Sequence, residues 1–255
     1  MRTMAAAVAV MCAALGCGKN EQAAEQAEAL RGVRSNMIVS DGRMHVVVEE
    51  GLAGLVDGQW QPEAELPPGD FVIGRSGNVI VAIPIRRRGK VLMIDLAARA
   101  VSVVATLEEP LAAAVVTHDG VYLHPEGTKV LRKLDLASGQ SAFAMEIPSS
   151  DEVVDAGPGR AAGAAVDVIW QLADGVTRWY AHGVPPEALA FAQIRVFAAA
   201  EGHVTVLSWQ TGELRAERRI PLAYGEAVQA MAVDGSSVFV LQAGRLGVYA
   251  WRSDE

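Results

Sequence analysis

The stretch "KVLRKLDLASGQSAFAM", residues 129–145, reads as a strand, a polar turn and a returning strand. Asp135 can begin this turn by accepting backbone N–H groups, and Gly139 can supply the positive φ that closes it. Two other stretches, residues 90–104 and 203–218, have the same form. We therefore predict that each of the three forms a β-hairpin.

Hairpins of a second kind precede several of these stretches. Their runs of Val, Ile and Leu are separated by pairs of Gly, Asp or Ser, which are typical of tight turns. They occupy residues 36–50, 71–85, 113–127 and 230–244. Because two hairpins in succession make a four-stranded unit, we expect an all-β fold.

The four-stranded unit recurs at a regular interval. Asp95 and Asp135 begin equivalent "DL" pairs 40 residues apart, and Ser138 and Thr211 precede turn glycines 73 residues apart. A period near 40 residues with four strands in each unit is typical of a β-propeller. Dividing residues 33–255 by a period of roughly 37 predicts about six blades, with five and seven as alternatives. A double sandwich would share the hairpins but not the period.

The segments "LDLASGQ" and "LSWQTGE" resemble the outer hairpin of the quinoprotein-type (PQQ-like, WD40-like) propeller repeat. The resemblance is good only within residues 129–145 and 203–218. Quinoprotein dehydrogenases hold a quinone with calcium, but they are larger, eight-bladed proteins with a Trp shortly after the Thr-Gly turn. The matching places here hold Ser141–Phe143 and Leu214–Glu217. We therefore expect the repeat to be architecture alone, with no cofactor and no metal.

The first residues of the chain are typical of a secretory signal. Arg2 gives a positive start, and the apolar segment Met4–Leu15 is shorter than the roughly 20 residues that a membrane span needs. The Leu-Gly-Cys sequence that ends at Cys17 resembles the lipobox of bacterial lipoproteins, although Ala14 stands where Leu is usual. This resemblance implies cleavage before Cys17 and a lipid on its thiol.

The predicted organisation has three parts. Residues 1–16 form a lipoprotein signal peptide, residues 17–32 carry the lipidated cysteine and a polar tether, and residues 33–255 form the propeller. Gly18 follows the anchor cysteine, whereas well-studied enterobacterial lipoproteins kept at the inner membrane have Asp there. We therefore expect a lipid-anchored protein of the cell envelope, at the outer membrane and facing the periplasm or the cell surface.

The chain has 255 residues, a formal net charge of −8, and 51% apolar but only 5% aromatic residues. Its acids and bases are interspersed, which argues against nucleic acid as a partner. Cys12 and Cys17 are the only cysteines, so a mature chain with one modified thiol cannot form an internal disulfide. The fold must therefore be held by a core of Val, Leu, Ile and Ala.

The sequence lacks the usual patterns of catalytic sites. It has no G-x-S-x-G turn, and the mature chain has no free thiol. The Gly-rich segment 155–163 is not followed by the crossover helix of a dinucleotide site, so we expect an interblade loop there. The histidines have no i, i+4 pair and are expected in surface loops, although two of them lie across one hairpin without a third ligand. They are His45, His118, His124, His182 and His203.

A basic run joins two of the predicted strands and is expected to be a solvated hairpin tip. It contains Arg86, Arg87, Arg88 and Lys90. Its functional interpretation is a contact for an acidic partner or a lipid headgroup.

Two expectations concern packing. The five tryptophans are spread about one per blade, as packing between blades would have them. The last segment, residues 227–252, shows three clear strands, so we predict that a strand from Ser35–Ser40 completes its sheet and removes an open edge.

The function favoured by the sequence is a non-enzymatic scaffold that binds other envelope proteins, as in the propeller lipoproteins of outer-membrane barrel assembly. The alternative is a small-ligand receptor or an enzyme that uses the central funnel, with acids such as Asp119, Asp155 and Asp234 near strand ends. Such a funnel needs polar side chains from several blades facing one point. The repeat-equivalent positions are mostly Ala, Val and Gly, which favours the scaffold.

Overall fold

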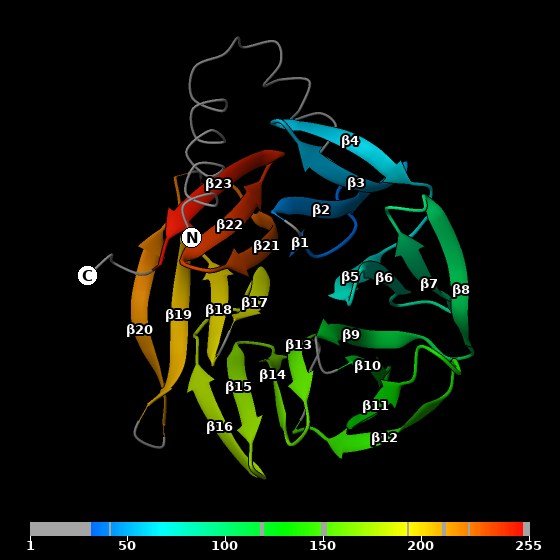
Figure 1. Cartoon of the computed structure of the whole chain (residues 1–255). Coiled ribbons are helices and arrows are strands. Elements are labelled where there is room, and N and C mark those ends of the chain that lie inside the picture. Colours follow the sequence, from blue (N-terminus) through cyan, green and yellow to red (C-terminus); the bar gives the residue numbers. More distant parts are fainter. Residues whose placement is uncertain are drawn as a thin grey trace.

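The computed structural model describes residues 32–40, 42–117, 120–148, 152–192, 194–210, 213–223 and 225–251. The predicted signal peptide, Cys17 and most of the tether lie outside these residues. Six antiparallel sheets stand side by side around a central axis, as Figure 1 shows. The prediction of an all-β propeller with about six blades is confirmed.

The six sheets follow one another along the chain. Blade 1 has β1 (Ile38–Ser40), β2 (Arg43–Val48), β3 (Gly51–Val56) and β4 (Gln59–Ala64). Blade 2 has β5 (Phe71–Ser76), β6 (Val79–Pro84), β7 (Gly89–Asp95) and β8 (Ala100–Leu107). Blade 3 has β9 (Leu111–Thr117), β10 (Gly120–Pro125), β11 (Val130–Leu134) and β12 (Ser141–Glu146).

The second half of the ring continues the pattern until its last member. Blade 4 has β13 (Glu152–Gly157), β14 (Arg160–Ala165), β15 (Val168–Ala173) and β16 (Val176–Ala181). Blade 5 has β17 (Ala188–Ala192), β18 (Arg195–Ala200), β19 (His203–Gln210) and β20 (Glu213–Pro221). Blade 6 has three described strands, β21 (Val228–Asp234), β22 (Ser237–Gln242) and β23 (Arg245–Ala250). The first strand of each blade faces the axis and the last strand lies at the rim (Figure 1).

The predicted hairpin turns form as their residues require. The carboxylate of Asp135 accepts the backbone N–H groups of Ser138 and Ala137 at 3.0 and 2.7 Å, and these bonds hold the pKa of Asp135 below its usual value. Gly139 closes the turn with a φ of +71°. Asp95 accepts the N–H of Ala98 in the equivalent turn between β7 and β8.

The hydrophobic core is divided into six clusters, one at each junction between neighbouring blades. Phe71 and Leu52 share the junction of blades 1 and 2, and Tyr122 and Trp170 share that of blades 3 and 4. Each sheet thus buries its faces against its neighbours, as repeat architectures require.

The tryptophans do not follow the expected spacing of one per blade. Trp170 and Trp179 lie opposite each other on the two outer strands of blade 4, while blades 2 and 3 have none. Trp170 is fully buried between blades, but Trp179 is half exposed because it lies on the rim strand. Trp251 packs between blades 5 and 6, with its ring 5.3 Å from that of Phe197.

The ring does not close in the predicted way. β1 pairs with β2 of its own blade, so the expectation that Ser35–Ser40 completes the last sheet is wrong. Blade 6 instead meets blade 1 through side chains, where Met37 and Met44 pack with Phe239 and Leu241. Burial of Met37 in this cluster fixes the segment at the inner edge of blade 1.

The residues just before β1 tie blade 1 to blade 2. The backbone N–H of Phe71 donates to the carbonyl of Arg34 at 2.8 Å, and Ser35 bridges Phe71 in parallel register. The side-chain amide of Asn36 then takes the place of a strand residue. It donates to the carbonyl of Ile73 and accepts the N–H of Ile73, both at 2.8 Å.

The Gly-rich segment 155–163 lies inside blade 4, where a turn at Pro158 and Gly159 joins β13 to β14. The expectation of an interblade loop is therefore wrong. Gly163 is needed because a Cβ there would collide with the Glu152 carbonyl and the Trp170 ring. Within the described part of the chain, no helix has the length and apolarity that crossing a membrane requires.

Replacing Asn36→Ala should lower the free energy of unfolding by about 1–2 kcal/mol, because both backbone groups of Ile73 lose their partner. The measurement is chemical denaturation followed by tryptophan fluorescence. Asn78→Ala is the control, since Asn78 lies in the exposed turn between β5 and β6 and should change stability by less than about 0.5 kcal/mol. Equal effects of the two substitutions would contradict the role given to Asn36.

Candidate functional site

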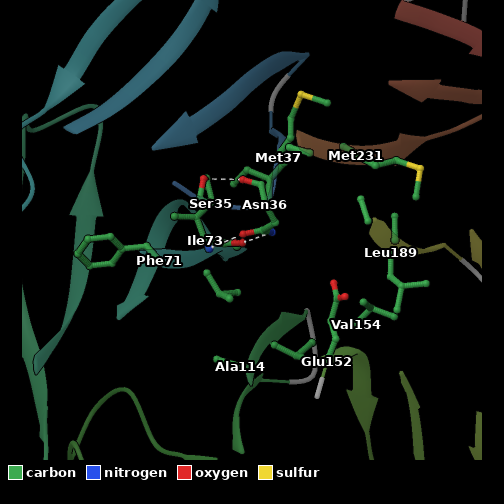
Figure 2. A pocket seen from close by; sticks show the side chains of 18 of the residues that line it. Ser35, Asn36, Met37, Phe71, Ile73, Ala114, Glu152, Val154, Leu189 and Met231 are labelled. Carbon is green, nitrogen blue, oxygen red and sulfur yellow. Dashed lines mark hydrogen bonds between the residues drawn. The ribbon is translucent and has the colours of Figure 1, made fainter. Parts of the chain in front are cut away.

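One candidate site is a cavity along the propeller axis, shown from close by in Figure 2. Its open volume is about 660 Å³, which is within the usual range for small-ligand sites. The innermost strands of all six blades line it, together with the segment before β1. The channel stays open because many of its lining residues are small. They include Gly74, Ala112, Ala114, Ala188, Ala190, Ala230 and Ala232.

Several polar side chains of the channel are held by backbone groups. Glu187 accepts the N–H of Val228 at 2.6 Å, and Gln229 accepts that of Gly244 at 2.9 Å. At the opposite end of the channel, Thr117 donates to the carbonyl of Ala156 at 3.3 Å. These bonds position loops and neighbouring blades, as those of Asn36 do.

Glu152 differs from these residues. It begins β13, and Figure 2 shows its carboxylate directed into the channel among Ala114, Val154 and Leu189. Among the residues that the structure describes, none donates a hydrogen bond to this carboxylate. Burial raises the pKa of Glu152 to about 7, and the positive charge of Arg86 acts in the opposite direction. The channel therefore contains an acid that titrates near neutral pH.

The predicted basic tip does join two strands, β6 and β7, but its cations have different surroundings. Arg87 turns inward, with its guanidinium 5.2 Å from the ring centre of Phe71. Arg86 lines the channel and is held by its backbone N–H, which donates to the carbonyl of Leu111 at 2.8 Å. Arg88 and Lys90 are exposed. Three of the four cations are thus accessible near one end of the channel.

The acids that the sequence suggested for the funnel do not meet there. Asp155 is buried and pairs with Arg160 at 3.1 Å, so its charge is compensated inside blade 4. Asp234 ends β21 at the turn into β22, and Asp119 lies outside the described residues. Sequence reasoning missed Glu152. The sequence feature that could have identified Glu152 is an acid at the first position of an innermost strand. The innermost strands of blades 2 and 3 begin instead with the apolar residues Phe71 and Leu111.

Two histidines are structural, and the expectation of surface loops is wrong for them. His45 is 1% exposed and its Nδ1 lies 2.7 Å from the carboxylate of Glu63. His124 is 2% exposed, with Nε2 2.9 Å from the carbonyl of Thr128. His118, suggested to meet it across the hairpin, lies outside the described residues. In the described parts of the chain, no three or more His, Cys, Asp and Glu side chains gather as metal ligands would.

Replacing Glu152→Gln should change how stability depends on pH. The native pKa near 7 exceeds the ordinary value of 4.5, so the folded protein keeps a proton that the unfolded chain releases in this window. The stability of the wild type therefore falls as pH rises from about 4.5 to 7. We expect the variant to be more stable by about 1–3 kcal/mol at pH 8 and equally stable at pH 4.

The measurement is urea denaturation of both proteins across this pH range, with the exposed Glu65→Gln as control. Subtracting the free energy of unfolding of the wild type from that of Glu152→Gln at each pH cancels the contribution of all other titrating groups. A difference that does not vary with pH would contradict the burial of this carboxylate.

Comparison with known proteins finds similar folds but no similar sequence. The sequence matches no family profile and no curated protein. Among solved structures, an auxiliary nutrient binding protein from Bacteroides thetaiotaomicron is similar with a TM-score of 0.62 at 7% identity, over 86% of this chain and 70% of that one. BamB from Moraxella catarrhalis is similar with a TM-score of 0.52 at 12% identity, over 86% of this chain and 85% of that one.

A third similar structure is the extracellular domain of BT4673 from B. thetaiotaomicron, with a TM-score of 0.54 and 12% identity. The match covers 87% of this chain and 33% of that one, so the chain spans about a third of that length. At these identities the likeness concerns the fold. The chain is a six-bladed β-propeller, and its structural neighbours include binding proteins.

Proposed function

We propose that this protein is a non-enzymatic β-propeller that binds other proteins of the bacterial cell envelope and is anchored by a lipid on Cys17. The anchor rests on the apolar opening segment and the Leu-Gly-Cys sequence. The binding role is supported by the fold and by its likeness to BamB and to the nutrient binding protein. The outer membrane is the proposed location, with the propeller facing the periplasm or the cell surface.

The observation that carries the docking proposal is the accessible charge of the loop between β6 and β7. Arg86, Arg88 and Lys90 are exposed, and no described residue forms an ion pair with them. Unpaired cations at one face of the ring can attract and orient an acidic partner surface. Arg87 stabilises the loop itself by packing on Phe71.

A binding role also agrees with how the polar side chains of the channel are used. Asn36, Glu187 and Gln229 hold backbone groups and serve the scaffold. Nucleophilic catalysis would need a nucleophile within hydrogen-bond reach of a base. Thr117 is a hydroxyl in the channel, and it donates to backbone carbonyls.

The docking proposal is tested by charge reversal. The double variant Arg88→Glu and Lys90→Glu should reduce recovery of crosslinked envelope proteins at least tenfold, measured by affinity capture and mass spectrometry from cells. The matched control is Arg43→Glu with Arg99→Glu. These exposed arginines lie at hairpin turns on the opposite face of the ring.

Equal loss of partners in both double variants would point to net charge rather than to the loop. Unchanged recovery in both would remove the loop as a docking site. Either result would overturn the proposal as it concerns Arg88 and Lys90.

The anchor is tested separately by Cys17→Ala in the full chain. Wild-type protein should incorporate an alkyne-labelled fatty acid and fractionate with membranes, because the acylated thiol inserts in the bilayer. The variant should lose the label and should no longer pellet with membranes. Cys12→Ala is the control and should keep both properties. A wild-type chain without label would contradict lipidation.

A further inference from the structure

The interior of the channel has a chemistry distinct from that of the docking loop. One carboxylate, that of Glu152, points into a cavity whose lining includes apolar side chains as well as Arg86. The labelled walls in Figure 2 come from different blades and include Ile73, Ala114, Val154 and Met231. A carboxylate that receives no hydrogen bond from the described residues gains most from a ligand with charged N–H donors.

The charged groups around this carboxylate leave room for such a ligand. Arg86 lies near enough to oppose the rise of the pKa of Glu152, yet it makes no hydrogen bond to the carboxylate. Asp70 and Glu187 also line the channel, and Glu187 already accepts the N–H of Val228. Arg34 and Arg75 line the channel as well, but Arg34 pairs with Glu49 and the Nε of Arg75 donates to the carbonyl of Gly77.

A metal ion is a poorer match for this donor set. Calcium takes about six to eight oxygen ligands, and magnesium is usually bound by one or two carboxylates together with several waters. The described residues provide no cluster of three potential ligands here. An organic cation needs one carboxylate and an apolar wall, and these are the two elements that the channel combines.

We propose that the central channel binds a small organic amine, with its protonated amino group at Glu152 and its aliphatic or aromatic body against partly exposed apolar residues of the lining such as Val154 and Phe191. The volume of about 660 Å³ accommodates a body of this size. The site is independent of the test of the proposed docking function, because it uses the channel interior and neither Arg88 nor Lys90.

The probe for this site is 2-phenylethylamine, and its neutral isostere 2-phenylethanol is the matched control. In isothermal titration calorimetry at pH 8 with the full-length protein in detergent, the amine should bind once per chain with a Kd of about 0.1–1 mM. The alcohol should bind at least tenfold more weakly, because it lacks the charge. Saturable binding that is equal for amine and alcohol, or no saturable binding of the amine up to 20-fold above this range, would overturn the proposal.

Two variants locate the site. Glu152→Gln should weaken binding of 2-phenylethylamine at least tenfold, since the amide keeps the shape but not the charge. Glu187→Gln should keep the affinity within twofold, because its side chain serves the Val228 N–H. Wild-type affinity in Glu152→Gln, or an equal loss in Glu187→Gln, would overturn the assignment to Glu152.

The pH profile of the wild type tests the same contact without a substitution. The amine stays protonated between pH 6 and 8, whereas Glu152 ionises in this range, so affinity should rise about tenfold. Arg34, Arg75 and Arg86 also line the channel, and Asp70 and Glu187 are exposed acids. An affinity that does not change with pH would contradict the proposal. Failure of these binding tests would leave the partner recovery with Arg88 and Lys90 unaffected, so the two functions are judged separately.

Discussion

Apolar packing between neighbouring sheets is the constraint on which the whole structure depends. A four-stranded sheet has two faces, and a single blade has no layer of its own to cover either of them. Phe71, Trp170 and Phe197 are each fully buried at a different junction, and together the six junctions contain the core. Because every junction needs a neighbour on the other side, the arrangement is satisfied only when the ring closes. The open axis is a result of that closure, since small residues line the innermost strands.

The parts of the fold that sequence could predict are local. A hairpin depends on a few adjacent residues, so Asp135 and Gly139 were sufficient to indicate one, and the repeat of such turns gave the number of blades. Closure depends on contacts between residues far apart in the chain. The amide of Asn36 binds Ile73, and Met37 packs beside Phe239, so β1 stays in its own blade. No periodic pattern contains this information.

The candidate site shows the same division. Its position near a strand end made Asp155 a candidate for the funnel. Its ion pair with Arg160 across the turn is seen only in the three-dimensional structure. Successive side chains of a strand face opposite sides, so a small error in the start of β13 moves an acid from the channel to the core. Glu152 falls on the channel side and lacks a described partner. Its raised pKa follows from that placement, and composition alone gives no means to distinguish it from other acids.

The chain order of the strands has a consequence for how such a ring can change. Every sheet is built from consecutive strands, and no described blade borrows a strand from another. A break in any connection between blades would therefore leave each sheet whole, so circular permutants joined at a different junction retain the same pairings. Duplication or loss of one complete blade likewise preserves all hydrogen-bonded ladders. Evolution of this architecture can thus proceed by exchange of whole modules, with the seam between the last and first blades repacked by side-chain substitutions alone.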